Sequence, residues 1–174
     1  VHDLCERKKV NPECLYNAYQ TGLFFQKLPN SLYVDKAKKK DYAGTKRMKD
    51  KERITLMVCT SADGWHVPLA LIGKFKKPVC FQLLPNPKKS SIAYTNQRNA
   101  WFDKIVTEWW IRHVFWPEHL KRHGDVNCIL LFDNFSGHNV DTSKFSPRLT
   151  IFFLPANVTC KHQPADMGMI ASLK

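Results

Sequence analysis

The sequence has no apolar run long enough to cross a bilayer and no secretory leader at its start, so we expect no membrane attachment. Acidic residues are scarce, with 15 Asp and Glu against 27 Lys and Arg, for a net charge of +12. Such an excess is typical of a protein with a polyanionic partner, most often nucleic acid. A merely soluble basic protein, or one drawn to acidic membrane surfaces, has the same composition. The clustering of the charge favours nucleic acid.

The sequence also lacks paired cysteines. None of its six cysteines has C-x-x-C spacing, and Cys59 and Cys128 lie inside apolar segments. This pattern predicts reduced thiols that act as small core residues in a cytosolic or nuclear protein, with a disulfide or zinc framework as the weaker alternative. Two glycosylation sequons, at Asn134 and Asn157, would go unused in such a protein.

Length and composition predict one folded domain. The 174 residues are 44% apolar, which is enough for a packed core. Because the chain begins with Val and ends inside an apparent helix, we expect residues 1–174 to be a single domain truncated at both ends of a longer protein.

One stretch, residues 126–138, organises the rest. Six of its first seven residues are apolar, Asp133 follows them, and the stretch continues into a polar turn with Gly137 and His138. Such a run predicts a strand buried on both faces, and an acid at its end lies at the carboxyl edge of the sheet, where α/β sheets bind ligands. Taken alone, the pattern favours a simpler interpretation, a strand followed by a capping Asp.

A second apolar strand, residues 149–154, strengthens the functional interpretation. It is followed by Pro164, which suits the first position of a helix, and by Asp166 in the first turn of that helix. The connection lengths place Asp133 and Asp166 at the ends of neighbouring elements. We therefore predict that the two carboxylates lie close enough to share one cation.

These segments resemble the DDE superfamily endonuclease domain of pogo/Tigger-type transposases, including the jerky and centromere protein B relatives. The matching segments occur in the family's order and cover most of the chain: residues 16–24, 51–55, 62–64, 68–74, 77–78, 131–138, 153–159, 163–166 and 170–174.

The resemblance implies an RNase H-like fold in which three acids hold two divalent cations, Mg²⁺ or Mn²⁺, that cut and rejoin DNA. It makes Asp133 the second acid and Asp166 the third. The first acid normally lies in a strand reading Asn-x-Asp-Glu-Thr-Gly, where this chain has Tyr19 in place of the aspartate and Gln20 in place of the glutamate. This departure predicts impaired catalysis within an unchanged fold.

A basic cluster in residues 35–53 is the predicted DNA contact. Its density, together with the family resemblance, favours contact with phosphates over a merely solvated surface. The expected contacts are Lys38, Lys39, Lys40, Lys46, Arg47 and Lys49.

Hydrophobic periodicity predicts strands over residues 14–25, 54–60 and 67–72, then a helix capped by Thr95 or Asn96, then the two strands described above and a last helix. Residues 1–13 are expected to be a polar tail, and Asp63-Gly64 a hairpin turn. The predicted helix has a wide apolar face made of two rows, Trp101, Ile105 and Trp109 in one and Phe102, Val106 and Trp110 in the other. Pro117 opens a short second helix, residues 118–123. The resulting fold is α/β, a mixed five-stranded sheet with helices on its faces.

Three functional hypotheses follow. In the first, the chain is a nuclear, DNA-associated, transposase-derived domain that has lost cleavage. In the second, it is an active metal-dependent endonuclease or transposase with a substitute ligand. In the third, it is a degenerate transposon remnant. His138 is expected to hold the turn through a hydrogen bond, with a supporting role at the site as the alternative.

Overall fold

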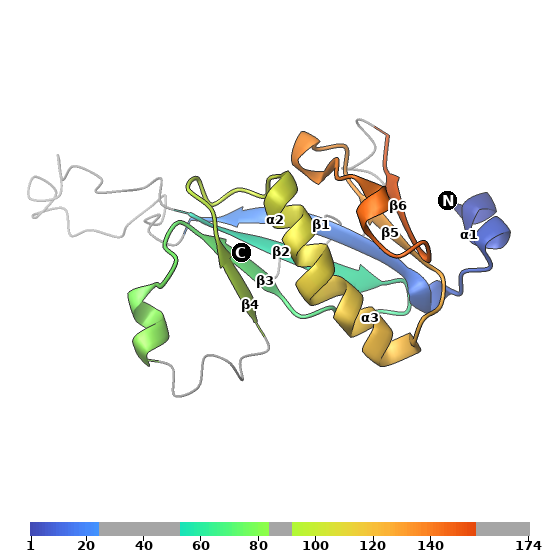
Figure 1. Ribbon diagram of the computed structural model, residues 1–174, viewed down its shortest axis with the longest axis horizontal. Helices are drawn as coiled ribbons and strands as arrows, with labels where there is room; N and C mark the ends of the chain where they lie inside the picture. The colour runs from blue at the N-terminus through green and yellow to red at the C-terminus, as the bar shows by residue number, and fades with distance from the viewer. Residues whose placement is uncertain (25–52, 84–91, 156–174) are drawn as a thin grey trace, which may run out of the picture.

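A six-stranded mixed sheet forms the centre of the protein, in the order β4-β3-β2-β1-β5-β6 (Figure 1). The computed structural model describes residues 1–24, 53–83 and 92–155. The strands are β1 (Leu15–Leu23), β2 (Ile54–Ser61), β3 (Ala70–Gly73), β4 (Ala93–Asn96), β5 (Cys128–Phe132) and β6 (Leu149–Phe153).

The sheet has an antiparallel half and a parallel half that meet at β1. Strand β1 pairs antiparallel with β2 along its whole length, and β2 pairs antiparallel with β3. On its other side β1 runs parallel to β5, and β5 runs parallel to β6. Parallel pairing brings the carboxyl ends of β5 and β6 to one edge of the sheet, where Asp133 lies.

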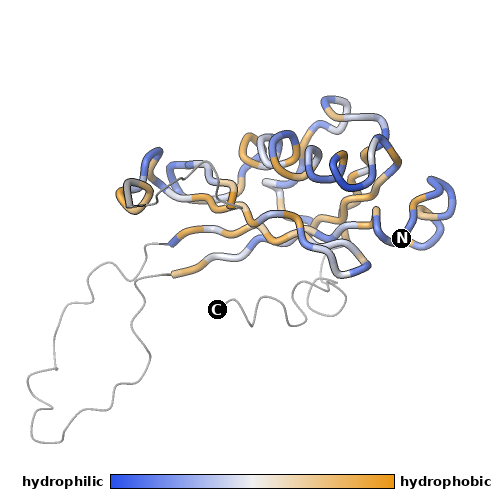
Figure 2. Tube along the Cα trace, turned by 90° about the horizontal axis from the view of Figure 1, so that it is seen from below, coloured by the Kyte–Doolittle hydropathy of each residue, from blue (hydrophilic) through white to orange (hydrophobic). Residues whose placement is uncertain are grey.

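One face of the sheet is covered by a long helical segment (Figure 2). It consists of α2 (Lys104–Trp110), a π-helical turn η5 (Ile111–Phe115) and α3 (Trp116–His123), which follow one another without a break. Pro117 lies in the first turn of α3, where a missing N–H costs little. Pro117 therefore opens a second helix as predicted, but the helical path continues through it.

Large side chains from this helical segment pack against alternate residues of the central strands. Phe115 meets Tyr16 edge to face at 5.0 Å between ring centroids, and Trp110 meets Phe132 at 6.0 Å. All four rings are buried. Cys59 and Cys128 are buried and unpaired as predicted, and Cys14 is buried with them.

The predicted strand count was wrong, because β4 was missed. Residues 93–96 were expected to lead into a helix, but they pair in parallel with β3 from Ala70↔Ala93 to Gly73↔Asn96. This pairing gives hydrogen-bond partners to the backbone groups on the outer edge of β3. The helix begins only at Lys104, where the Asp103 side chain caps it by accepting the Val106 N–H.

The late helix start also corrects one row of the predicted apolar face, while the other row, Phe102, Val106 and Trp110, is buried as predicted. Trp101 lies in the loop before α2 and is 44% exposed, and Ile105 is 79% exposed. Trp109 packs partly buried against the core. Strand β3 begins three residues later than expected, after Pro68, which lacks an N–H for strand pairing.

The remaining predictions were confirmed in part. The Asp63-Gly64 turn is present, with Gly64 at φ 90°, and joins β2 to β3. The expected polar tail instead contains the helix α1 (His2–Lys8). Within the described residues, no helix combines the length and apolarity needed to cross a membrane.

Candidate functional site

Asp133 follows the last residue of β5 and is held by the turn that comes after it. Its Oδ1 accepts hydrogen bonds from His138 Nδ1 at 2.5 Å and from the Phe135 backbone N–H at 3.3 Å. No described residue hydrogen-bonds to Oδ2. The Asp133 side chain keeps 18% of its surface exposed. One oxygen therefore fixes the orientation of the carboxylate, while the other is available to a ligand.

His138 is the residue that orients Asp133. Its side chain is fully buried, against the rings of Phe102, Phe132 and Phe135. Because a carboxylate can only accept, Nδ1 carries the proton of this hydrogen bond. Nε2 is buried with no hydrogen-bond partner among the described residues. The predicted structural role of His138, a hydrogen bond that holds the turn, is confirmed.

The turn itself requires the glycine at position 137. A Cβ there would meet the Phe102 carbonyl oxygen and the Phe135 ring at less than contact distance. Thr107 of α2 donates a hydrogen bond of 3.0 Å to the Gly137 carbonyl. The 3-10 turn Ser136–His138 is therefore fixed to the helical layer, and through His138 it fixes Asp133.

Strand register relates Tyr19 to Asp133. The last matched pair between β1 and β5 is Asn17 with Leu131. The strands are parallel, and Tyr19 and Asp133 each follow two residues later. Continued by two residues on each strand, this register sets Tyr19 across from Asp133, beyond the last paired residues and just past the end of β5. Tyr19 is partly buried and pairs with Val58 on its other side.

Several predicted site residues lie outside the described residues, so their positions relative to Asp133 stay predictions. They are Asp166 and the basic residues Lys38, Lys39, Lys40, Lys46, Arg47 and Lys49. For a divalent cation, the described part of this edge offers one available carboxylate oxygen, that of Asp133. A hard oxygen donor of this kind suits Mg²⁺ or Mn²⁺, and further ligands are needed to complete a site.

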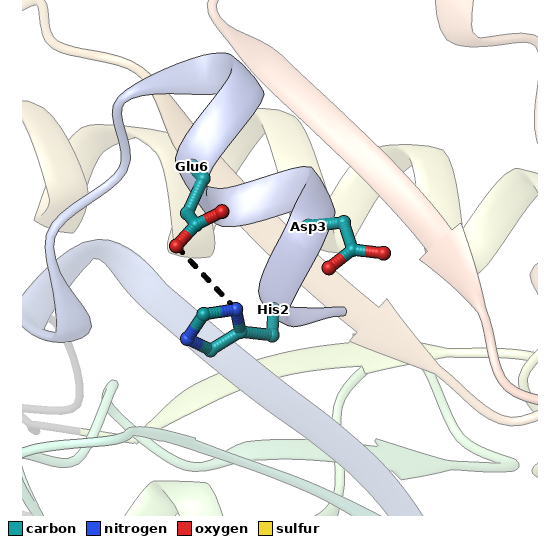
Figure 3. A group of neighbouring side chains, drawn as sticks. All are labelled: His2, Asp3 and Glu6. Atoms are coloured by element: carbon teal, nitrogen blue, oxygen red, sulfur yellow. Dashed lines mark ion pairs between the residues drawn. The ribbon is translucent and has the colours of Figure 1, made fainter.

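Among the described residues, one group of three potential metal ligands lies within reach of a single ion: His2, Asp3 and Glu6 of α1 (Figure 3). All three are exposed, and His2 Nδ1 lies 3.6 Å from Glu6 Oε1, one helical turn away. This is an ordinary surface contact on a seven-residue helix. It lies apart from Asp133, and we assign it no role.

Sequence analysis missed a stack of three side chains next to Asp133. The Arg53 guanidinium carbon lies 3.5 Å from the centroid of the Trp101 ring, and the Trp101 and Phe135 rings stack at 6.2 Å and 21°. Trp101 was expected to be part of the core face of a helix. The sequence feature that could have predicted its position is the segment 97–100 before it, whose polar residues favour a loop over a helix.

Comparisons with known proteins identify the family of this chain. The sequence profile of the family described as DDE superfamily endonuclease matches residues 51–174. Over 171 residues the chain is 36% identical to the Jerky protein of Mus musculus, covering 92% of this chain and 28% of that protein. It is 29% identical to the Tigger transposable element-derived protein 7 of Homo sapiens, covering 92% of this chain and 30% of that protein.

A solved structure shows the same fold. The Mos1 transposase, in a paired-end complex with a left transposon end, superimposes with a TM-score of 0.55 and 13% identity, covering 98% of this chain and 44% of that one. The fold is therefore RNase H-like, of the α/β class, as predicted.

The mixed six-stranded sheet, with a helical layer on one face and Asp133 after the end of β5, defines the broad class as RNase H-like α/β domains. Within that class, the chain belongs to the DDE superfamily endonuclease family, in its pogo/Tigger-type branch. It spans less than a third of the length of the relatives compared above.

Proposed function

We propose that this chain is a transposase-derived DDE endonuclease-like domain that binds DNA in the nucleus and whose metal-dependent cleavage is impaired. The observation that carries the proposal is the parallel register of β1 and β5, which, continued two residues past its last pair, sets Tyr19 across from Asp133. A family whose chemistry uses clustered acids has a phenol there in this chain.

The chemistry of the tyrosine is unsuited to that position. Divalent cations bound at such a site activate the attacking oxygen and stabilise the leaving oxygen of a phosphodiester. Asp133 Oδ2 would hold one cation, with Asp166 as the proposed second ligand. A tyrosine phenol has an ordinary pKa near 10 and is neutral at pH 7, so Tyr19 adds no negative charge. Its ring also occupies more space than an aspartate.

DNA as the partner rests on charge and on family membership. The chain carries a net charge of +12, and the solved structure with the same fold is a transposase bound to a transposon end. The proposed phosphate contacts are the basic residues between Lys36 and Arg53. Binding through such residues is independent of sequence and falls steeply with salt.

One observation favours the alternative, an active endonuclease. The turn that orients Asp133 is intact, with His138 buried and its hydrogen bond in place. A chain that has lost its chemistry has no catalytic need for that arrangement. The His138 ring also fills the core, however, so its packing alone explains why it is retained in a domain that no longer cuts.

Two assays test the proposal. The first measures nicking of supercoiled plasmid in Mn²⁺ by this chain and by Asp133→Asn; we expect no nicking by either. Nicking that Asp133→Asn abolishes would contradict impairment and establish the alternative. The second measures the affinity for a short duplex against salt concentration. The slope of log K against log salt should be about −0.9 per phosphate contact, and absence of binding at low salt would remove DNA as the partner.

A further inference from the structure

We propose that Arg53, Trp101 and Phe135, here called the aromatic stack, bind an unpaired nucleotide of a DNA strand next to Asp133. The base packs against the ring surfaces that Arg53 leaves uncovered, and the Arg53 guanidinium contacts the adjoining phosphate. This proposal rests on the proposed DNA-binding function and specifies the state of the DNA that the site receives.

The stack joins a cation to two exposed rings. Trp101 is 44% exposed and Phe135 is 37% exposed. Arg53 lies 3.5 Å over the Trp101 ring and donates to the Asn99 carbonyl at 3.4 Å. Within the described residues no acidic side chain contacts Arg53, so its charge is not offset there. Nucleic-acid-binding proteins hold single strands in this way, with rings for the bases and cations for the backbone.

The loop that carries Trp101 is held in place by specific contacts. Gln97 Oε1 accepts the N–H groups of Asn99 at 2.6 Å and of Trp101 at 3.3 Å. Thr55 donates to the Ala100 carbonyl at 2.5 Å. Ala100 has φ 51°, a left-handed conformation that is unfavourable for alanine. An exposed tryptophan presented by a strained and well-bonded loop is typical of a binding surface.

The aromatic stack is joined directly to the candidate site. The Phe135 backbone N–H donates to Asp133 Oδ1, the same oxygen that His138 holds. A nucleotide on the stack therefore lies against a residue, Phe135, that is hydrogen-bonded to the carboxylate of the candidate site. A phosphodiester attached to that nucleotide would be presented near Asp133.

The physical chemistry favours an unpaired base over a duplex. Bases within a duplex already stack on one another and expose only their edges and backbone. An unpaired base has a free face, and stacking that face on an aromatic ring removes apolar surface from water. An apolar protein partner fits less well, because covering the rings would also bury the Arg53 charge.

A second Arg–Trp stack, between α3 and the loop after β2, provides the matched control. Arg122 lies 4.7 Å over the Trp65 ring, beyond the opposite end of β2 from Arg53. Arg122 is ion-paired with Asp63 at 2.5 Å, so its charge is already offset. This stack has the same two residue types, but its cation is ion-paired and Asp133 is not its neighbour.

The test compares two fluorescein-labelled DNA probes by anisotropy at one low salt concentration. One is a short duplex with a few unpaired thymidines at one 3′ end, and the other is the same duplex with those positions paired. We expect the chain to bind the first probe at least about 5-fold more tightly, the lower end for one stacked base. Trp101→Leu should remove this preference, Trp101→Phe should keep most of it, and Trp65→Leu should leave it unchanged.

The outcomes separate the two proposals. Equal binding of both probes by the unaltered chain, or a preference that survives in Trp101→Leu, would overturn the aromatic stack and leave DNA binding in place. Binding of neither probe would overturn the proposed function itself. If Trp101→Leu fails to fold, Arg53→Gln decides: it should reduce the preference and make the salt slope shallower by about 0.9. An unchanged preference and slope would overturn the proposal.

Discussion

Tyr19 and Asp133 follow, at equal spacing, the paired residues Asn17 and Leu131 of two parallel strands. Continued past that pair, the register sets a phenol, and not a second carboxylate, across from the described acid of the candidate site. Two carboxylates that share a cation each contribute negative charge and oxygen ligands. With Tyr19 in place, Asp133 is the one carboxylate that the described residues offer to a cation at this edge of the sheet.

Replacing His138 should weaken metal binding without any change to a metal ligand. His138→Phe keeps an aromatic ring in the buried position but removes the hydrogen bond that orients Asp133 Oδ1. Loss of such a supporting hydrogen bond typically lowers metal affinity by about 10- to 100-fold. Calorimetric titration with Mn²⁺ measures this change. His113→Phe, at an exposed position on the helical layer, is the control and should leave the affinity unchanged. Equal affinities for His138→Phe and the unaltered chain would show that the hydrogen bond does not orient the carboxylate.

Gly137→Ala should destabilise the fold, because the added Cβ would meet the Phe102 carbonyl and the Phe135 ring. We expect a loss of about 1–3 kcal/mol in the free energy of unfolding, the usual cost of overpacking. Gly22→Ala is the matched control. Its Cβ would lie 3.7 Å from the nearest atom, Arg53 Cδ, so it should be neutral or stabilising by up to about 1 kcal/mol. Urea denaturation of both variants checks this contrast, and equal effects would contradict the proposed packing.

The buried His119 should make stability depend on pH between about 7.5 and 5. Tyr16 donates to His119 Nδ1 at 3.1 Å, and His119 Nε2 donates to the Val126 carbonyl at 3.2 Å, which fits a neutral ring. Burial lowers the pKa of His119, and the nearby His123 lowers it further, while the hydrogen bond to Val126 acts in the opposite direction. The unfolded chain therefore binds this proton more readily than the folded one. The stabilisation that neutral His119 gives the folded state is fully present above the unfolded pKa of about 6.5, and it is lost as the pH falls below that value.

For this one group, the free energy of unfolding cannot change by more than about 1.4 kcal/mol per pH unit. Urea midpoints of the unaltered chain should fall from about pH 7.5 to pH 5. His119→Gln should be less stable at pH 7.5, because it disturbs the hydrogen bond with Tyr16. Its urea midpoint should nevertheless change less with pH. Parallel pH profiles for the two proteins would show that His119 is not the source of the dependence.

The sequence was sufficient to predict the strands around the site and the role of its turn. Strand β5 was visible as an apolar run ending at Asp133, because a strand buried on both faces must be apolar throughout. The hydrogen bond of His138 followed from a histidine in a tight polar turn. The parallel register, which relates Tyr19 to Asp133, needed tertiary pairing and could be expected only from the family resemblance.

The region before α2 could not be predicted from periodicity. Trp101, Ile105 and Trp109 recur at helical spacing, yet the helix begins after the first of them. Two nonlocal contacts decided the outcome: the pairing of β4 with the outer edge of β3, and the hydrogen bond from Thr55 to the Ala100 carbonyl. A sequence pattern shows neither, because both depend on segments that are distant along the chain.

The most direct test of the account is Mn²⁺ titration by calorimetry on the unaltered chain and on Tyr19→Asp, with Tyr19→Phe as the control for loss of the phenol. If Tyr19 occupies the place of the first acid, Tyr19→Asp adds a carboxylate beside Asp133 and should bind Mn²⁺ at least about 10-fold more tightly, a gain of about 1.4 kcal/mol. Tyr19→Phe should bind as weakly as the unaltered chain. Equal affinities for Tyr19→Asp and the unaltered chain would mean that Tyr19 does not stand at the metal site, and the proposed cause of impaired cleavage would be wrong.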